Sequence, residues 1–198
     1  MNPSVSKRDQ ILRTAFELFT SSSYHTVSID DILGKAGASK GALFHHFSNK
    51  YELASESFLK ILDEEWIGRL SDLESVANPA VRIQKFIDFS VDMAIDNPKL
   101  MRFALELMEE GEKRGEDGEQ WRDFLDHFVK MLGAMLAECN VPNPYIKAEL
   151  LLASLDAISL QTAFFKGAEA ALEPALLKTE IFEVFVGNYT QRSKGEHE

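Results

Sequence analysis

The side chains best suited to binding chemistry lie close together, between residues 26 and 50. Lys40 and Lys50 carry positive charges that can neutralise phosphate groups, and Gly41 lets the backbone approach phosphates or base edges closely. The hydroxyl groups of Thr26 and Ser28 lie where a helix is predicted to begin, and the backbone N–H groups of a helix N-terminus attract anions. This combination of residues favours contacts to phosphates and to the edges of bases.

Helices joined by a tight turn must position these residues. Ser6, Ser28, Ser39 and Asn49 each precede an apolar helical pattern as an N-cap, and Gly37 ends the helix that Ser28 begins. A helix, a short turn and a second helix form a helix-turn-helix, in which the second helix can enter a major groove about 12 Å wide. The same spacing fits an ordinary αα corner with capping serines, so spacing alone leaves both interpretations open.

Other chemistry finds little support in the sequence. Successive residues of a helix diverge by about 100°, so His45 and His46 cannot both ligate one ion. Asp123 and His127 form a lone pair at i, i+4, and the chain has no HExxH motif, no GxSxG motif and no repeated Glu-x-x-His pair. Cys139 is the single cysteine, which excludes a disulfide or a four-thiolate zinc site within one chain. We therefore expect no catalytic residue, no metal and no cofactor.

The net charge is divided unevenly along the chain. The 198 residues include 21 Lys and Arg against 32 Asp and Glu, a formal charge of −11. Residues 1–55 hold six basic and five acidic side chains, a net charge of +1, which leaves −12 for residues 56–198. Such asymmetry suggests that the two parts have different partners. The acidic total is therefore weak evidence against binding of nucleic acid, which prefers basic surfaces.

The composition is that of a folded, cytoplasmic protein. Hydrophobic residues make up 45% of the chain, enough apolar surface to offset the entropy cost of folding. The first residues lack the apolar stretch of a secretory signal. The longest weakly charged run, residues 150–165, contains Asp156 and is too short to span a bilayer, so we expect no membrane partner.

Apolar spacing predicts helices nearly throughout, and hence an all-α fold of about nine helices. The third helix, which Ser39 caps, is expected to carry Leu43, Phe44 and Phe47. The sequence 111–118 is predicted to be an exposed charged loop. The later predicted helices cover residues 79–96, 98–110, 119–138, about 145–166 and about 174–191.

The segment from Tyr24 to Leu53, YHTVSIDDILGKAGASKGALFHHFSNKYEL, resembles the N-terminal DNA-binding segment of TetR-family transcriptional repressors. The features that carry the resemblance are Ile32, Ala36-Gly37, Ser39-Lys40-Gly41, Leu43, Phe47 and Lys50-x-Glu52-Leu53. The chain also departs from the pattern. Phe44 stands where the family often has Tyr, so a phosphate bond from that ring is lost, and Ser23, Val27 and Leu33 replace a frequent Gly, Thr and Ala.

The resemblance implies an N-terminal three-helix helix-turn-helix domain, residues 1–55, followed by a larger helical effector-binding and dimerisation domain, residues 56–198. It implies double-stranded DNA with a palindromic operator as one partner and a second copy of the chain as another. The residues expected to contact DNA are Thr26, Ser28, Ser39, Lys40, Gly41, Ala42, His45, His46 and Lys50.

The acidic remainder is expected to hold a small hydrophobic or aromatic effector and to form the dimer. Candidate effector contacts are Trp66, Phe89, Met93, Phe103, Trp121, Phe124, His127, Phe128 and Gln161. Candidate dimer contacts are Leu155, Ile158, Phe165, Leu177, Ile181 and Phe185. Each of these residues also fits the core of a single chain. The function expected is a ligand-responsive repressor. The alternatives are a constitutive DNA-binding regulator without an effector and a helical enzyme.

Overall fold

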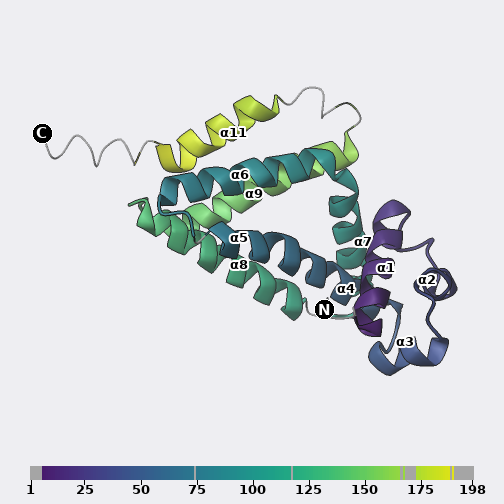
Figure 1. Cartoon of the computed structure of the whole chain (residues 1–198). Coiled ribbons are helices and arrows are strands. Elements are labelled where there is room, and N and C mark those ends of the chain that lie inside the picture. Colours follow the sequence, from purple (N-terminus) through teal and green to yellow (C-terminus); the bar gives the residue numbers. More distant parts are fainter. Residues whose placement is uncertain are drawn as a thin grey trace, which may run out of the picture. The chain divides into compact units, whose positions relative to one another are not determined.

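The computed structural model describes residues 6–73, 75–116, 118–165, 167, 173–187 and 189, and the described residues contain helices and no strand (Figure 1). This confirms the predicted all-α fold. The helices of the first part are α1 (Lys7–Ser21), α2 (Ile29–Ala36), α3 (Lys40–His46), α4 (Lys50–Leu62), a π-helical turn η1 (Asp63–Ile67) and α5 (Gly68–Leu73). They are followed by α6 (Pro79–Asp96), α7 (Pro98–Arg114), α8 (Glu119–Glu138), α9 (Pro144–Phe164), α11 (Pro174–Phe182) and a second π-helical turn η2 (Glu183–Gly187).

The chain forms two compact units. Unit 1 contains the described residues up to Glu65 together with Lys99–Gly118, so almost all of α7 returns to the N-terminal helices. Unit 2 contains Trp66–Pro98 and the described residues from Glu119 onward. The predicted domain boundary after residue 55 separates a DNA-binding part from an effector-binding part. This functional division stays a prediction.

Side-chain caps begin the first four helices at the predicted residues. The side chains of Ser6, Ser28, Ser39 and Asn49 each accept a hydrogen bond from a backbone N–H group three residues later in the chain. At Ser28 the bond is reciprocated, because the Asp31 carboxylate accepts from the Ser28 backbone N–H at 2.8 Å. Such caps satisfy N–H groups that a helix leaves without partners.

Unit 1 is built around α1. Ile11, Leu12, Ala15 and Phe19 of this helix are almost completely buried. The ring of Phe103 from α7 lies 5.3 Å from that of Phe19, measured between centroids. Aromatic rings in such arrangements contribute more than their buried area alone. A helix distant in the sequence therefore completes the core beneath the N-terminal helices.

Unit 2 is a layered helical core in which α9 packs against both α6 and α8 (Figure 1). Its buried centre includes Ile87 of α6, Leu132 of α8, and Leu151 and Leu155 of α9. The Thr162 hydroxyl donates to the carbonyl oxygen of Ala94 at 2.6 Å, which ties α9 to α6. Among the residues described, no helix is long and apolar enough to cross a membrane.

The prediction of a loop over residues 111–118 is wrong in its first half. Helix α7 continues to Arg114, and only the following residues turn. Two ion pairs at i, i+4 support this last turn, Glu109 with Lys113 at 2.6 Å and Glu110 with Arg114 at 2.7 Å. The run of charges therefore belongs to a solvated helix end.

Candidate nucleic-acid interface

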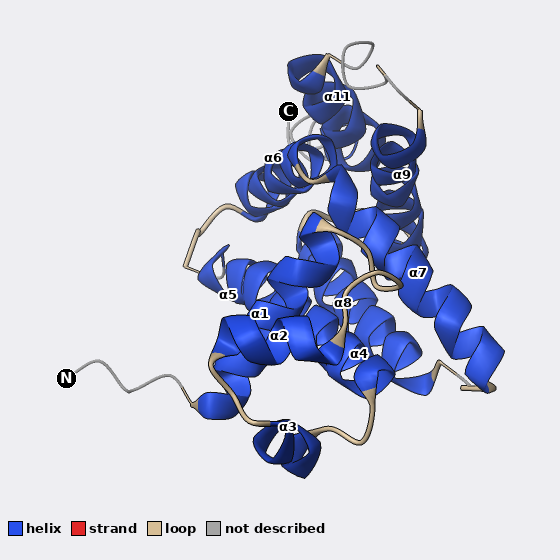
Figure 2. Ribbon diagram, turned by 90° about the vertical axis from the view of Figure 1, so that its right-hand side faces the viewer, coloured by secondary structure: helices blue, strands red, loops and turns tan. Residues whose placement is uncertain are grey.

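The turn between α2 and α3 depends on Gly37. This residue follows Ala36 with a φ of +56°, in the left-handed region that side chains disfavour, and its N–H group donates to the Leu33 carbonyl. Two residues later Ser39 caps α3. In Figure 2, α3 lies at the edge of unit 1, next to α1 and α2. The arrangement is a helix-turn-helix.

One face of α3 is open to solvent. Lys40, Gly41, Phe44 and His45 are exposed, whereas Leu43 is completely buried. The exposed residues pair at i, i+4, so they form one continuous strip. Their alignment places a cation, an open stretch of backbone, an aromatic ring and an imidazole on the side that a groove could receive.

Ala42 and His46 lie at the flanks of this face. Both are half-buried, and the ring of His46 lies edge-to-face with that of His45, with 5.0 Å between their centroids and 61° between their planes. Across the described part of the chain, no three His, Cys, Asp or Glu side chains lie close enough to hold a metal ion.

Phe44 is the residue that sequence reasoning missed. It was not among the expected DNA contacts, yet 44% of it is exposed on the open face of α3. Leu43 and Phe47, four residues apart, define the buried side of α3, and Phe44 is rotated by about 100° from Leu43, which brings its ring to the open side. The spacing of four residues between Leu43 and Phe47 was the sequence signal that could have placed Phe44 on the exposed side.

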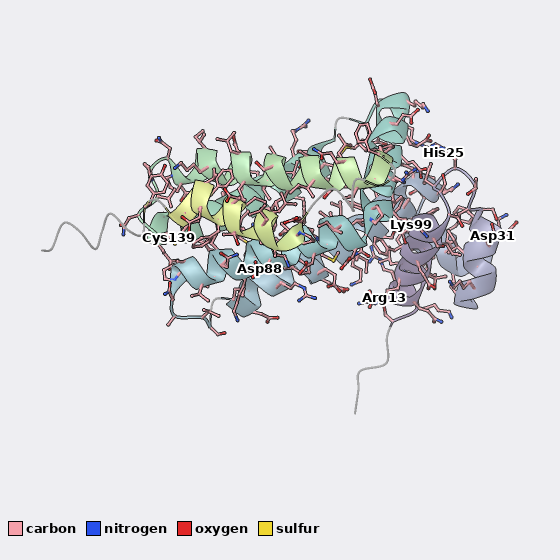
Figure 3. All side chains as sticks on the ribbon, turned by 90° about the horizontal axis from the view of Figure 1, so that it is seen from above. Arg13, His25, Asp31, Asp88, Lys99 and Cys139 are labelled. Carbon is pink, nitrogen blue, oxygen red and sulfur yellow. The ribbon has the colours of Figure 1, made fainter. Side chains whose placement is uncertain are left out.

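The predicted hydroxyl contacts are exposed, and each serves the local fold. Ser39 accepts from the Ala42 N–H at 3.1 Å, which leaves its hydroxyl proton able to donate to a phosphate. Ser28 instead donates its proton to Asp31 at 2.6 Å, and this bond lowers the pKa of the Asp31 carboxyl (labelled in Figure 3). Thr26 donates to the Ser23 carbonyl at 3.3 Å.

Lys50 faces inward within unit 1. Its ammonium nitrogen lies 4.5 Å from the centroid of the Tyr24 ring and 5.9 Å from that of Phe19. Burial lowers its pKa, and the carboxylates of Glu110 and Glu106 oppose that effect. Lys50 therefore joins α4 to the loop before α2, whether or not it also reaches a phosphate.

Substituting Lys50 with Ala distinguishes a phosphate contact from a packing role for this residue. We expect Lys50→Ala to weaken binding to all duplex sequences alike, and to reduce the slope of log affinity against log salt by about one if the ammonium neutralises a phosphate. Binding titrations of a random-sequence duplex at several salt concentrations measure this slope. An unchanged slope, with a lower midpoint of thermal unfolding, would assign Lys50 to packing alone.

The predicted effector residues do not form a single cluster. Trp66, Phe89, Phe124 and Phe128 belong to one aromatic group in unit 2, where the Trp66 ring lies 5.3 Å from Phe89 and 5.9 Å from Phe128. Met93 is half-buried on α6, and Trp121 is half-buried on α8. Phe103 belongs to the core of unit 1 instead.

The two polar residues chosen as effector anchors, His127 and Gln161, are exposed. A groove of about 400 Å³ lies elsewhere in unit 2, between α8 and α9. It is lined by Arg122, Leu125, Asp126, Val129, Glu149, Leu152, Ala153 and Asp156. None of the predicted effector residues lines this groove.

Most of the predicted dimer residues are buried within the chain itself. Leu155, Ile158, Ile181 and Phe185 belong to the core of unit 2, and Leu177 is half-buried against it. Phe165, at 63% exposure, is open to a partner. The large apolar residues that are exposed on or next to α9 and on α11–η2 are Tyr145, Ile146, Leu150, Leu160, Phe164, Phe165, Leu176 and Val184. We call them the apolar strip.

Comparison with known proteins agrees with this architecture. Residues 11–56 match the family described as bacterial regulatory proteins, tetR family. The activator FasR of Mycolicibacterium smegmatis is 32% identical over 152 residues, which is 77% of this chain and 55% of FasR. The repressor KstR2 of Mycobacterium tuberculosis is 35% identical over 81 residues, 40% of each chain. The chain thus spans about half the length of the curated relatives that it matches.

Solved structures share the fold across nearly the whole chain. A transcriptional regulator from a Rhodococcus species superimposes with a TM-score of 0.74 at 22% identity, covering 94% of this chain and 97% of that one. A TetR-family regulator from Mesorhizobium loti gives a TM-score of 0.72 at 20% identity, covering 92% and 96%. The matched segment contains α2, the Gly37 turn and α3. Residues 11–56 of the chain therefore carry the segment that defines the tetR family of bacterial regulatory proteins, and the chain has the fold of solved TetR-family regulators.

Proposed function

We propose that the protein is a ligand-responsive transcriptional repressor, which binds a palindromic operator in the cytoplasm as a homodimer. The observation that carries the DNA-binding part is the exposed face of α3, where Lys40, Gly41, Phe44 and His45 lie together on the helix that follows the Gly37 turn. An α-helix fits the major groove, where base edges can be distinguished.

The proposed contacts divide into two groups. Lys40, Gly41, Ala42, His45 and His46 face or flank the bases, and Phe44 joins them. Thr26, Ser28, Ser39 and Lys50 lie at or near the start of α2, α3 or α4, where helix N-termini attract phosphate oxygens; the Ser39 hydroxyl can donate as the structure stands, whereas those of Thr26 and Ser28 would first exchange their present acceptors. The local net charge of +1 is small, so specific binding depends on placed contacts more than on general attraction.

Phe44 is expected to contact a thymine methyl group, the apolar feature that the major groove offers. Replacing thymine by deoxyuracil in a selected operator removes that methyl without changing the pairing edge. We expect the replacement to weaken binding of the wild-type protein by a fewfold and to leave binding of Phe44→Ala unchanged. Equal losses for both proteins would place the ring away from thymine.

The apolar strip supports homodimerisation. Its members on α9 include Ile146, Leu150, Leu160 and Phe164, which recur along one side of that helix, and each has more than two fifths of its surface exposed. Exposed apolar surface of this extent marks an interaction site. A dimer would present two copies of α3 to half-sites about one turn of DNA apart.

The aromatic group in unit 2 supports an effector with apolar or aromatic character, because a ligand inserted among these rings would meet both faces and edges. The chain has two tryptophans, and Trp66 lies inside this group. Ligand binding there should change Trp66 fluorescence. In energetic terms, the effector must bind more tightly to the form that does not bind DNA.

The whole proposal is tested in two stages. Duplexes enriched from a random pool by the wild-type protein define the operator. A panel of apolar and aromatic compounds is then screened for release of that duplex and for a fluorescence change in Trp121→Phe, which keeps Trp66. A compound that does both supports the repressor. Failure of every compound to weaken operator binding would favour a constitutive regulator without an effector.

A further inference from the structure

The loop between α1 and α2 is hydrogen-bonded to α7, a helix that comes much later in the sequence. Ser23 and Tyr24 belong to this loop, and Glu106 reaches them from the middle of α7, more than eighty residues further along the chain. All three residues belong to unit 1. Figure 2 shows the loop and α7 within the same part of the molecule.

Both oxygens of the Glu106 carboxylate are engaged in this contact. One accepts from the Ser23 hydroxyl at 2.7 Å, and the other accepts from the Tyr24 backbone N–H at 2.7 Å. Hydrogen bonds to a charged acceptor are stronger than bonds between neutral groups. Glu106 is half-buried, which limits competition from water.

The bonds continue through the loop towards α2. The Ser23 hydroxyl oxygen accepts from the His25 N–H at 3.2 Å (His25 is labelled in Figure 3), and the Ser23 carbonyl accepts from the N–H groups of Thr26 at 3.3 Å and Val27 at 3.2 Å. Val27 is buried, and the next residue, Ser28, caps α2. The carboxylate on α7 therefore fixes the segment from which α2 begins.

The position of α7 is itself fixed against α4. A Cβ atom added to Gly111 would lie 2.5 Å from the hydroxyl oxygen of Tyr51, so the Tyr51 side chain of α4 packs directly against the backbone of α7 at this residue. The Arg114 guanidinium lies 5.3 Å from the centroid of the Tyr51 ring. Lys50, beside Tyr51, lies over the Tyr24 ring and balances the nearby carboxylates of Glu106 and Glu110.

We propose that Glu106 is a positioning residue for DNA binding, which sets the place of the loop and of the start of α2 without contacting DNA. The loop residues Thr26 and Ser28 are among the proposed phosphate contacts. A loop that is free to shift would lose these contacts on any sequence, whereas base readout by α3 depends on its own side chains.

The test of this proposal is whether a substitution of Glu106 weakens or strengthens DNA binding. Removing a negative charge from a DNA-binding protein ordinarily strengthens binding, because repulsion from phosphates falls. Glu106→Gln keeps the shape but loses the charge, and its amide oxygen can accept well from one of the two donors. We expect it to weaken binding about tenfold, equally for the selected operator and for a random-sequence duplex.

The matched control is Glu109→Gln, which removes the same charge from the same helix, where Glu109 is exposed and paired with Lys113. We expect its affinity for DNA to equal or slightly exceed that of the wild type. The amide proton resonance of Tyr24 should move upfield in Glu106→Gln and stay in place in Glu109→Gln, because only the first variant alters its acceptor.

A second variant keeps the proposal testable if Glu106→Gln folds poorly. Ser23→Ala removes one donor from the loop and leaves α7 unchanged, and we expect it to weaken binding to both duplexes by about threefold. All affinities are measured well below the unfolding midpoint of each variant. Wild-type or tighter DNA binding by the folded Glu106→Gln protein, or by Ser23→Ala where the first does not fold, would overturn the proposal.

Discussion

Replacing Leu150 by Arg is expected to convert the protein into a monomer and to remove most of its affinity for a two-half-site operator. Leu150 lies within the apolar strip on α9 and is 54% exposed in the single chain, so the substitution is tolerated by the fold of each subunit. In a dimer the same position would bury the guanidinium without a partner, at a cost of several kcal/mol.

The loss of DNA affinity follows from the loss of the second half-site. A dimer gains its second contact at high effective concentration, and such linkage raises affinity by about 10²–10⁴ over a single module. We therefore expect Leu150→Arg to bind the operator at least a hundredfold more weakly and a single half-site about as well as a wild-type subunit.

The matched control is Val81→Arg, which places the same charge on α6 at a residue that is 41% exposed and outside the apolar strip. Light scattering at micromolar concentration measures the mass of each protein. A monomeric wild-type protein, or a dimeric Leu150→Arg variant with full operator affinity, would show that the apolar strip is not the dimer interface.

The second large effect is expected on α3. Lys40→Ala and His45→Ala should each weaken operator binding by about 1–3 kcal/mol and should also relax base preference, because both side chains lie on the exposed face. Both residues are exposed, so neither substitution removes core packing.

The measurement compares the affinity of each variant for the selected operator and for a random-sequence duplex. The expected signature is a fall in the ratio of the two affinities, in contrast to Lys50→Ala and Glu106→Gln, for which the ratio stays constant. The matched control on the neighbouring helix is Lys35→Ala, which removes a cation that is paired with Glu17 at 2.7 Å. A constant ratio for both α3 variants would place base recognition elsewhere.

Local signals predicted the N-terminal helices well. Caps at Ser6, Ser28, Ser39 and Asn49 act within a few residues, and so does the left-handed Gly37, so the sequence around each contains the physical cause. The DNA-binding candidates all fall on these helices or on the segments between them. Their association with a groove still needed the family resemblance, because an αα corner has the same spacing.

The faces of α9 could not be predicted from spacing. Leu150, Leu151 and Leu152 point in successive directions, so the pattern lacks an apolar and a polar side. Packing against α6 and α8 buries Leu151 and leaves Leu150 exposed, and that choice is made by helices distant in the sequence. The predicted dimer residues were drawn mainly from the buried side for this reason.

The packing of α7 against the N-terminal helices could not be predicted from local sequence patterns either. Its residues continue the acidic part of the sequence, yet most of the helix packs with the N-terminal helices, and Glu106 bonds to their loop. The net charge of +1 counted for residues 1–55 is therefore not the net charge of unit 1, because unit 1 also contains most of α7. The carboxylates of α7 contribute structure there as well as charge.

Selection of duplexes from a random pool by the wild-type protein, followed by sequencing, tests the central claim most directly. The account predicts an enriched palindrome whose half-sites are about one turn of DNA apart, and loss of the enrichment with Lys40→Ala and with His45→Ala. Enrichment of no sequence, or of the same palindrome by both variants, would contradict sequence recognition through α3.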